Sequence, residues 1–180
     1  NSRGGSKKNI AEHYDLGNRF FEVWLDPSLT YSSAYYNGKN ITLAEAQAAK
    51  YERILDKLDV QSGHHLIEIG CGWGGFAEFA ARKTGARITA ITISRKQHDF
   101  AKARIKKAGL SHLVDVQLKD YRDLTIKADF IVSIEMLEAV GEDYWPEYFQ
   151  TVSQCLRRGG AAMIQVITVP DDEFAAYRKT

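Results

Sequence analysis

The segment Glu68-Ile69-Gly70-Cys71-Gly72-Trp73-Gly74-Gly75 joins an apolar run to an amphipathic one through closely spaced glycines. The apolar run, near residues 65–69, predicts a β-strand, and residues 76–83 predict a helix that begins directly after the glycines. Glycine lets the backbone turn sharply and leaves room for a ligand to touch the main chain. The unpaired N–H groups at the start of the helix would face such a ligand. The segment therefore predicts a nucleotide-type cofactor site at the end of the first strand of an α/β sheet.

Two cofactor motifs match this segment. Gly70, Gly72 and Gly75 fit the dinucleotide pattern G-x-G-x-x-G. Read from Glu68 to Gly74, the same residues fit acid-x-G-x-G-x-G, the first motif of S-adenosylmethionine methyltransferases. The acid inside the strand favours the methyltransferase. Thr92, at the end of the second predicted strand, stands where a ribose-binding acid is usual, so this position supports neither motif. A tight turn without a ligand is the third interpretation.

Composition excludes several classes of function. The chain has 180 residues, enough for one α/β domain with a substantial core, and its net charge of +1 argues against a nucleic-acid partner. Cys71 and Cys155 have no metal-ligand spacing, so we expect no metal and the reduced thiols of an intracellular protein. No apolar run approaches membrane-spanning length and no signal peptide is visible, so any membrane contact is expected to be peripheral.

The pattern of apolar residues and turn signals predicts alternating helices and strands. Helices are expected at about 10–25, from the capping box Thr42-Leu43-Ala44-Glu45, from a second capping box Ser94-Arg95-Lys96-Gln97 to about 108, and at about 144–156. Strands are expected at about 65–69, 87–93, 114–118, 129–134 and 162–168. The helix near 144–156 should bury Trp145, Tyr148, Phe149, Val152 and Leu156 and stop at Gly159-Gly160.

Strands that alternate with helices predict a parallel sheet with right-handed crossovers. We expect a linker or tail at 1–9, an N-terminal helical cap at 10–60 and a Rossmann-like core at 61–180. Both ends look cut, because the first residue is Asn1 and the chain stops soon after the fifth predicted strand. Ligands of such sheets bind beyond the carboxyl ends of the strands, where the glycines, Thr92 to Gln97, Asp120-Tyr121, Glu135 to Glu138 and Gln165 would gather.

Several longer motifs resemble one family. These are His13-Tyr14-Asp15-Leu16-Gly17-Asn18, Leu25-Asp26-Pro27, Thr30-Tyr31-Ser32-Ser33-Ala34-Tyr35-Tyr36, Glu68 to Gly75, Thr92-Ile93-Ser94-Arg95-Lys96-Gln97, Asp120-Tyr121-Arg122, Ile131 to Gly141 and Gln165-Val166-Ile167-Thr168. Together they resemble the catalytic domain of cyclopropane-fatty-acyl-phospholipid and mycolic acid cyclopropane synthases. The resemblance covers nearly the whole chain from Ile10 onward, and the His13 and Glu138 segments are its most specific parts.

The resemblance implies a fold, a reaction and a set of site residues. The implied fold is the Rossmann-like S-adenosylmethionine methyltransferase sheet, with about five parallel strands present and the C-terminal hairpin missing. The implied enzyme, cytoplasmic and peripheral at the inner membrane surface, transfers a methyl group to a cis double bond of an unsaturated phospholipid acyl chain; a homodimer is compatible with it. The residues implied to bind the cofactor S-adenosylmethionine are Tyr31, Ser32, Glu68, Gly70, Cys71, Gly72, Gly74, Thr92, Ile93, Gln97, Tyr121 and Arg122.

The catalytic side of the resemblance includes two departures. The family is thought to hold a bicarbonate ion as a base, and Glu138 matches the glutamate that helps to position it. The other interpretation of Glu138 is a surface carboxylate that caps the following turn. Ser33 and Gln165 stand where many members have cysteine and histidine, which is typical of a branch in which some relatives install a methyl branch instead of a ring. Ser33 and Gln165 keep hydrogen-bonding capacity but offer neither a thiol nor an imidazole. Glu135, three residues before Glu138, is interpreted as a cofactor-side or solvent carboxylate and not as catalytic.

Other interpretations stay open for single residues and for the whole chain. Tyr31 and Tyr121 could be packed aromatics, and Gln97 could only cap its helix. Tyr14, Phe20, Phe21, Trp24, Tyr35 and Tyr36 could line a lipid tunnel or belong to the core. The rival functions are a small-molecule amine methyltransferase, a cofactor-binding fragment without activity and, more distantly, a nicotinamide dehydrogenase.

Overall fold

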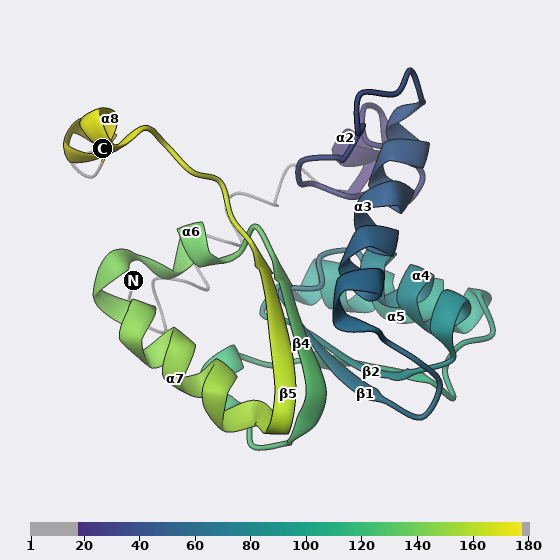
Figure 1. Ribbon diagram of the computed structural model, residues 1–180. Helices are drawn as coiled ribbons and strands as arrows, with labels where there is room; N and C mark the ends of the chain where they lie inside the picture. The colour runs from purple at the N-terminus through teal and green to yellow at the C-terminus, as the bar shows by residue number, and fades with distance from the viewer. Residues whose placement is uncertain (1–17, 178–180) are drawn as a thin grey trace.

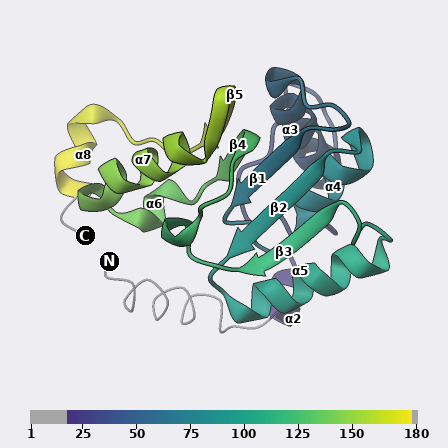
Figure 2. The same ribbon diagram turned by 90° about the horizontal axis from the view of Figure 1, so that it is seen from below.

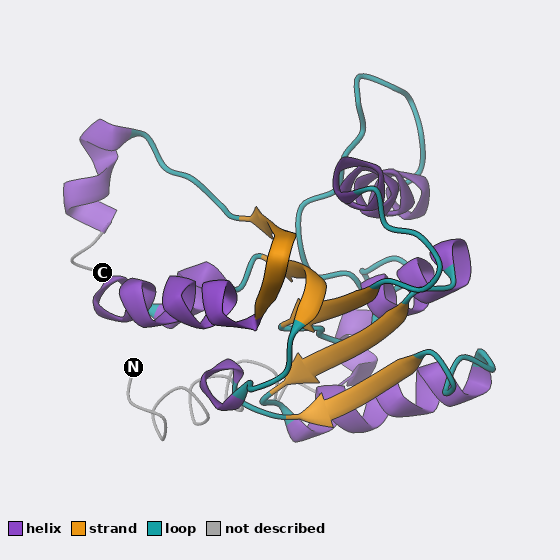
Figure 3. Cartoon of the chain, turned by 60° about the horizontal axis from the view of Figure 1, so that its bottom comes forward, coloured by secondary structure: helices purple, strands orange, loops and turns teal. Residues whose placement is uncertain are grey.

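The computed structural model describes residues 18–177, which form a five-stranded parallel sheet with helices on both faces (Figures 1 and 3). The strands are β1 His65–Ile69, β2 Arg87–Thr92, β3 Val114–Leu118, β4 Ala128–Ile134 and β5 Leu156–Gln165. Figure 2 shows them side by side in the order β3-β2-β1-β4-β5. This is the parallel α/β architecture that the sequence predicts, and the bounds of β1 and β3 agree with the expected ranges.

The helices alternate with the strands, as parallel pairing requires. They are α2 Asn18–Glu22, α3 Leu43–Leu58, α4 Gly75–Thr84, α5 Arg95–Lys107, α6 Leu137–Val140, α7 Trp145–Cys155 and α8 Asp171–Tyr177, with short 3₁₀ turns η1 Tyr121–Asp123 and η2 Glu142–Tyr144. The helix α8, which the sequence did not predict, stands apart from the sheet at the end of an extended segment (Figure 1).

Alternation of side chains along the strands builds two cores. Leu66, Ile88 and Val116 point to one face, where they pack with apolar residues of α3, α4 and α5. Ile67 and Ile69 point to the other face, where they pack with residues of α6 and α7. The inner strands of the sheet are therefore buried on both sides, which explains why apolar residues of β1 point to both faces.

The order of the strands places a crevice at the end of β1. The chain runs from β1 outward through β2 and β3, then returns to the other side of β1 to form β4 and β5. The connection after β1 leads to β2 on one side, whereas the connection after β4 leads to β5 on the other side. The loops that follow β1 and β4 therefore separate and leave a crevice beyond the carboxyl ends of these strands. The glycine loop follows β1 and Glu135 follows β4, so both reach the same crevice.

The two predicted capping boxes have different outcomes. At α3 the box is complete, because Glu45 N donates to Thr42 Oγ1 at 3.3 Å and Thr42 N donates to the Glu45 carboxylate at 2.8 Å. At α5 the prediction is wrong in its second half. Ser94 accepts from Gln97 N, but the Gln97 side chain accepts from Thr92 Oγ1 and leaves the helix terminus. Thr92, which lines the cavity, therefore binds the Gln97 side chain that the sequence pattern assigned to the cap of α5.

The end of α7 also corrects the sequence prediction. The helix ends at Cys155, and Gly159-Gly160 lie within β5 rather than stopping the helix. The strand starts with a register shift against Ala128 and Phe130, and a Cβ on Gly160 would lie 2.6 Å from Asp129 O. The glycines therefore serve a strand irregularity that passes close to a neighbouring backbone.

Two further details of this region differ from the prediction. The strand β5 ends at Gln165 and not at residue 168. Phe149 is 46% exposed, whereas Tyr148 beside it is buried. Tyr148 and Phe149 are adjacent in α7, but only Tyr148 lies on the apolar face of the helix that packs against the sheet.

The N-terminal predictions fall only partly on described residues. The expected linker at 1–9 and residues 10–17 of the expected first helix lie outside the described range. Within it, α2 ends at Glu22, earlier than the predicted end near residue 25. No helix among residues 18–177 combines the length and the apolar character needed to cross a bilayer.

Candidate functional site

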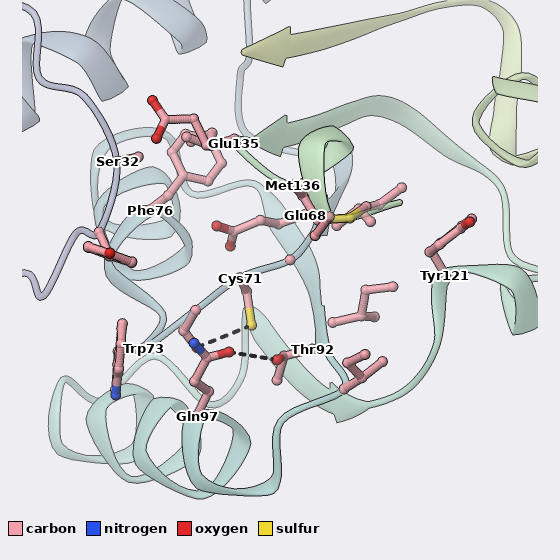
Figure 4. Close-up of a pocket in the computed structure, with 18 of the residues that line it drawn as sticks. Ser32, Glu68, Cys71, Trp73, Phe76, Thr92, Gln97, Tyr121, Glu135 and Met136 are labelled. Carbon is pink, nitrogen blue, oxygen red and sulfur yellow. Dashed lines mark hydrogen bonds between the residues drawn. The ribbon is translucent and has the colours of Figure 1, made fainter. Parts of the chain in front are cut away.

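A cavity of about 480 Å³ opens at the carboxyl edge of the sheet, around the glycine loop. It falls in the size range of small-molecule and cofactor sites. Segments distant in sequence line it, namely Leu29 to Ser32, Glu68 to Trp73, Gly75-Phe76, Ile91 to Ile93, Gln97, Lys119 to Arg122, Ile134 to Met136, Ala139-Val140 and Tyr144, together with Tyr51. Figure 4 shows that Gln97 and Tyr121 approach it from different elements, α5 and the turn after β3.

The glycine loop has the geometry that its sequence predicts. Gly70, Gly72 and Gly74 have backbone φ angles of +83°, +52° and +81°, which residues with a Cβ atom rarely adopt. Gly70 N and Cys71 N donate to Ile91 O at 3.0 and 2.9 Å, which ties the loop to β2. A Cβ at Gly70 would lie 2.9 Å from Met136 Cγ, whereas a Cβ at Gly72 would meet no atom within 4 Å. The loop is thus tightly packed behind Gly70 and open at Gly72.

Glu68 brings a buried carboxylate to this cavity. The side chain belongs to β1 and is 3% exposed, and its Oε2 has no hydrogen-bond partner among the described residues. Burial raises the pKa of Glu68 to about 8, against a hydrogen bond from the Ala77 backbone that lowers it. An unpartnered carboxylate oxygen in a cavity fits a ligand that carries a cationic or N–H group. S-adenosylmethionine carries such an ammonium group.

The far wall of the cavity is held by hydrogen bonds among its own residues. Thr92 Oγ1 donates to Gln97 Oε1 at 2.9 Å and accepts from Ser94 N at 3.2 Å, and Figure 4 shows the first contact. The Arg122 guanidinium binds Asp120 through Nε at 2.9 Å and Nη2 at 2.6 Å. These bonds fix the polar side chains before any ligand arrives.

The near wall is a loop, residues 26–33, anchored on α3 and α5. Asp26 accepts from Ser28 N at 3.0 Å and from Ser28 Oγ at 2.9 Å. Thr30 Oγ1 hydrogen-bonds the Tyr51 hydroxyl. Arg104 donates to Pro27 O at 2.7 Å and to Trp73 O at 3.2 Å, so one guanidinium holds both this loop and the glycine loop. Arg104 therefore joins the near-wall loop to the glycine loop.

A second carboxylate, Glu135, accepts hydrogen bonds from two residues that lie far from it in sequence. Ser33 N and Gln165 Nε2 each donate to Glu135 Oε1 at 2.9 Å, and the Ser33 hydroxyl donates to the same oxygen. Lys50 Nζ lies behind the loop and donates to Ser32 Oγ at 2.6 Å and Ser33 O at 2.9 Å. Burial lowers the pKa of Lys50 to about 8, although the nearby charges of Glu135 and Asp26 oppose this change.

The structure brings most of the predicted site residues together. All residues predicted to bind the cofactor line the cavity except Gly74, whose neighbour Gly75 lines it instead. Ser33 and Gln165 are not lining residues and contact the site through hydrogen bonds to Glu135. Glu138 is exposed, does not line the cavity and accepts a hydrogen bond from Ile167 N. The structure therefore brings Glu135, not Glu138, next to Ser33 and Gln165.

Sequence reasoning placed Glu135 at the ligand edge of the sheet, because its carboxylate directly follows an apolar parallel strand, but gave it no catalytic role. It missed Lys50, which carries no signal in the sequence, because it reads as one more lysine of an amphipathic helix until its 5% exposure is known. Among residues 18–177, no cluster of three or more histidine, cysteine, aspartate or glutamate residues is arranged to hold a metal ion.

The aromatic residues of the first segment divide between core and surface. Phe21 is 3% exposed and its ring lies 4.8 Å from that of Trp73, so it packs against the glycine loop. Phe20 and Trp24 are about half exposed and stack edge to face. Tyr31 lines the cavity, and Tyr121 both lines it and contacts the ring of Tyr148. Tyr14 lies outside the described residues.

The strand order, the glycine loop after β1 and the cavity beside it define a Rossmann-like domain of the methyltransferase class. Comparison with known proteins identifies its family. The family model for mycolic acid cyclopropane synthetase matches residues 2–180, and the chain belongs to this family.

Curated relatives and solved structures agree with this assignment. The chain is 42% identical over 186 residues to tuberculostearic acid methyltransferase UfaA1 of Mycobacterium tuberculosis (strain ATCC 25618 / H37Rv), covering 99% of this chain and 43% of that protein. It is 40% identical over 156 residues to the cyclopropane-fatty-acyl-phospholipid synthase of Escherichia coli (strain K12), covering 87% of this chain and 40% of that protein. The chain thus spans about two-fifths of the length of these relatives.

A solved structure shows the same fold in the family. The crystal structure of mycolic acid cyclopropane synthase CmaA1 complexed with SAH and CTAB superposes with a TM-score of 0.89 at 31% identity, covering 96% of this chain and 60% of that one. Coclaurine N-methyltransferase superposes with a TM-score of 0.79 at 22% identity over 86% of this chain and 44% of that one, which shows a shared fold alone.

Proposed function

We propose that the protein containing this chain transfers the methyl group of S-adenosylmethionine to the cis double bond of an unsaturated phospholipid acyl chain. The observation that carries the proposal is a single cavity that joins the methyltransferase glycine loop to a second polar cluster at the end of β4. Membership in the mycolic acid cyclopropane synthetase family supports a lipid acceptor.

The residues of the glycine-loop side fit the methyl donor. The backbone at Gly72 leaves space, Glu68 offers an unpartnered oxygen to an ammonium group, and Gln97 and Tyr121 supply a polar and an aromatic surface. When bound, S-adenosylmethionine supplies an electrophilic methyl group, which the electron pair of the double bond takes while the old bonding pair stays on sulfur. The chain's own task is to hold the two partners in line, because an alkene is a weak nucleophile.

The residues of the β4 side fit the alkylated acyl chain. Ile134, Met136 and Ala139 give this wall an apolar lining that suits an acyl chain. A bound acyl chain would have to keep water from the cationic carbon, which water would otherwise trap. Tyr31 and Tyr144 bring aromatic rings that stabilise positive charge. We propose that the product is a cyclopropane acyl chain, or a methylene-branched one that becomes the methyl-branched chain once a separate hydride donor reduces its double bond. A peripheral contact with the membrane and a homodimer are compatible features of the complete protein.

Labelled methyl donor tests the proposal. The full-length protein is incubated with S-adenosylmethionine labelled in its methyl group and with vesicles of dioleoylphosphatidylglycerol, and the lipids are analysed by mass spectrometry. We expect label in the acyl chains. Label that appears only in added amines would support a small-molecule methyltransferase instead. Tight binding of a nicotinamide dinucleotide without binding of S-adenosylhomocysteine would reject both.

A further inference from the structure

We propose that Glu135 is the catalytic base of this site and takes the place of a bound bicarbonate ion. The inference rests on the proposed function and names a further catalytic residue for it. It starts from an unusual feature: Glu135 lies directly after β4 with φ of +48°, a left-handed conformation that glutamate seldom adopts. Such backbone geometry persists where the surroundings hold it and is concentrated at functional sites.

Two segments distant in sequence hold Glu135 in place. Its backbone N donates to Gln165 O at 2.9 Å, which continues the pairing of β4 with β5 past the last strand residue. Its Oε1 receives the Gln165 amide, the Ser33 amide and the Ser33 hydroxyl. The side chain is therefore fixed by two segments that lie 102 and 30 residues away in the chain.

Glu135 binds the hydrogen-bond donors that the family resemblance assigns to a bicarbonate ion. Ser33 and Gln165 were expected to bind bicarbonate, but their described hydrogen bonds go to a carboxylate of the chain itself. A carboxylate and a bicarbonate ion present the same pair of acceptor oxygens to hydrogen-bond donors. The donors on Oε1 and the ammonium of Lys50 behind the loop stabilise the charged carboxylate.

The reaction requires a proton acceptor, and this role falls to the second carboxylate oxygen of Glu135, Oε2. All three hydrogen bonds end on Oε1, and Glu135 lines the cavity beside Met136 and Ala139, so Oε2 is the oxygen available to a ligand. The alkylated acyl chain must lose one proton. If it leaves the added methyl group, its C–H electron pair closes the three-membered ring; after a neighbouring hydride shift, that pair forms a carbon–carbon double bond instead. Oε2 accepts the proton, and the carboxylic acid returns it to water after the product leaves.

Lys50 acts as a positioning residue for this base. It touches Ser32 and Ser33 rather than the cavity, and it keeps the Ser33 donors in place. The negative charge of Glu135 also lies close enough to Lys50 to raise the pKa of Lys50 against the effect of burial. The network therefore extends from α3 through the loop to the ends of β4 and β5.

Glutamine and glycine substitutions separate a base from a merely structural residue. Glu135→Gln keeps the shape and the Oε1 acceptor but removes the proton acceptor, and Glu135→Gly removes the carboxylate at a φ that suits glycine. The full-length protein is assayed with labelled donor and dioleoylphosphatidylglycerol vesicles, with and without added bicarbonate. Binding of S-adenosylhomocysteine is measured by calorimetry and binding of ¹³C-bicarbonate by NMR. Glu52→Gln, on an exposed ion pair with Lys83, is the matched control.

The expected result has two parts. Glu135→Gln lowers acyl labelling at least about 100-fold, the usual contribution of a general base, while its affinity for S-adenosylhomocysteine stays within about threefold of the wild type. Glu135→Gly binds ¹³C-bicarbonate and regains at least about tenfold in activity when bicarbonate is added, within the range of general-base effects. The wild type and Glu52→Gln are active without bicarbonate.

Other results would overturn the inference. A wild type that needs bicarbonate, Glu135→Gln activity close to the wild type, or loss of activity in Glu138→Gln but not in Glu135→Gln would each assign the base elsewhere. These outcomes leave lipid methylation by the wild type intact. A wild type that binds S-adenosylhomocysteine but labels no acyl chain would instead reject the proposed function, and this inference with it.

Discussion

The cavity holds two carboxylates that the fold treats in opposite ways. Glu68, within β1, is buried with an oxygen that finds no partner among the described residues, and burial raises its pKa to about 8. Glu135, after β4, has three hydrogen-bond donors on one oxygen and a lysine behind them. The first carboxylate lacks a partner that a ligand can supply. The second is organised before any ligand binds, as a group that acts on a substrate should be.

This difference divides the site into a Glu68 side and a Glu135 side. The Glu68 side is built around β1, the glycine loop and α4, which are continuous in sequence, and Thr92, Gln97 and Tyr121 join it from other elements. It leaves space at Gly72 and one oxygen of Glu68 without a partner among the described residues. The Glu135 side is assembled from a loop, a strand end and a neighbouring strand, and its polar atoms satisfy one another. Variants that act on one side, or on the junction between the sides, test whether the division is real.

The largest effect is expected at Gly75, where the two sides meet. A Cβ there would lie 2.7 Å from Ser28 O and 3.3 Å from the Tyr51 hydroxyl. Gly75→Ala should therefore push away the loop that carries Ser33, cost about 1–3 kcal/mol in the free energy of unfolding and impair both ligand binding and methyl transfer. Denaturant unfolding and the lipid assay measure this. Gly72→Ala, which meets no protein atom, is the comparison: we expect it to lose about 1–2 kcal/mol through its positive φ and to weaken S-adenosylhomocysteine binding.

An intermediate effect is expected at Glu68, and it depends on pH. The folded state raises the pKa of Glu68 from 4.5 to about 8, so it binds the proton more tightly than the unfolded chain does. The stability from this group is fully present below pH 4.5 and is lost as the pH rises through about 8. Glu68→Gln should thus become more stable than the wild type toward pH 8 and bind S-adenosylhomocysteine about tenfold or more weakly. Urea titrations between pH 5 and 8.5 check this; parallel curves for both proteins would show that another group titrates.

The smallest effect is expected at Thr92, on the Glu68 side alone. Thr92→Val removes the hydrogen bond to Gln97 and should cost about 1 kcal/mol in stability and a few-fold in S-adenosylhomocysteine affinity. Thr89→Val is the matched control, because Thr89 lies on the same strand and makes a bond of equal length, 2.9 Å, to His65 outside the cavity. Equal losses of ligand affinity in both variants would contradict a local role for Thr92.

The sequence predicted the parts of the site that local patterns encode. The glycine spacing, the acid at Glu68 and the strand and helix around them specify a strand–loop–helix unit, because positive φ and backbone approach require glycine at particular positions. Alternating strands and helices were enough to predict a parallel sheet with its ligand edge. The resemblance supplied the family, which the comparisons confirm.

Local patterns failed where a second contact competes for the same residue. Gln97 reads as the second half of a capping box, yet Thr92, five residues earlier at the end of β2, binds its side chain. Gly159-Gly160 read as a helix stop, yet they serve the passage of β5 past Asp129. Each error comes from a contact with a strand that the pattern of a helix end does not include.

The amino-acid order alone therefore determined the α/β class, the glycine loop and the presence of Glu68, since each depends on backbone conformation over a few consecutive residues. Only the tertiary structure decided which carboxylate faces Ser33 and Gln165. Glu135 and Glu138 lie three residues apart, and the resemblance favoured Glu138, but the left-handed turn after β4 directs Glu135 to the cavity and leaves Glu138 exposed beside Ile167. That choice depends on contacts between segments far apart in the chain, which the packing of the sheet alone brings together.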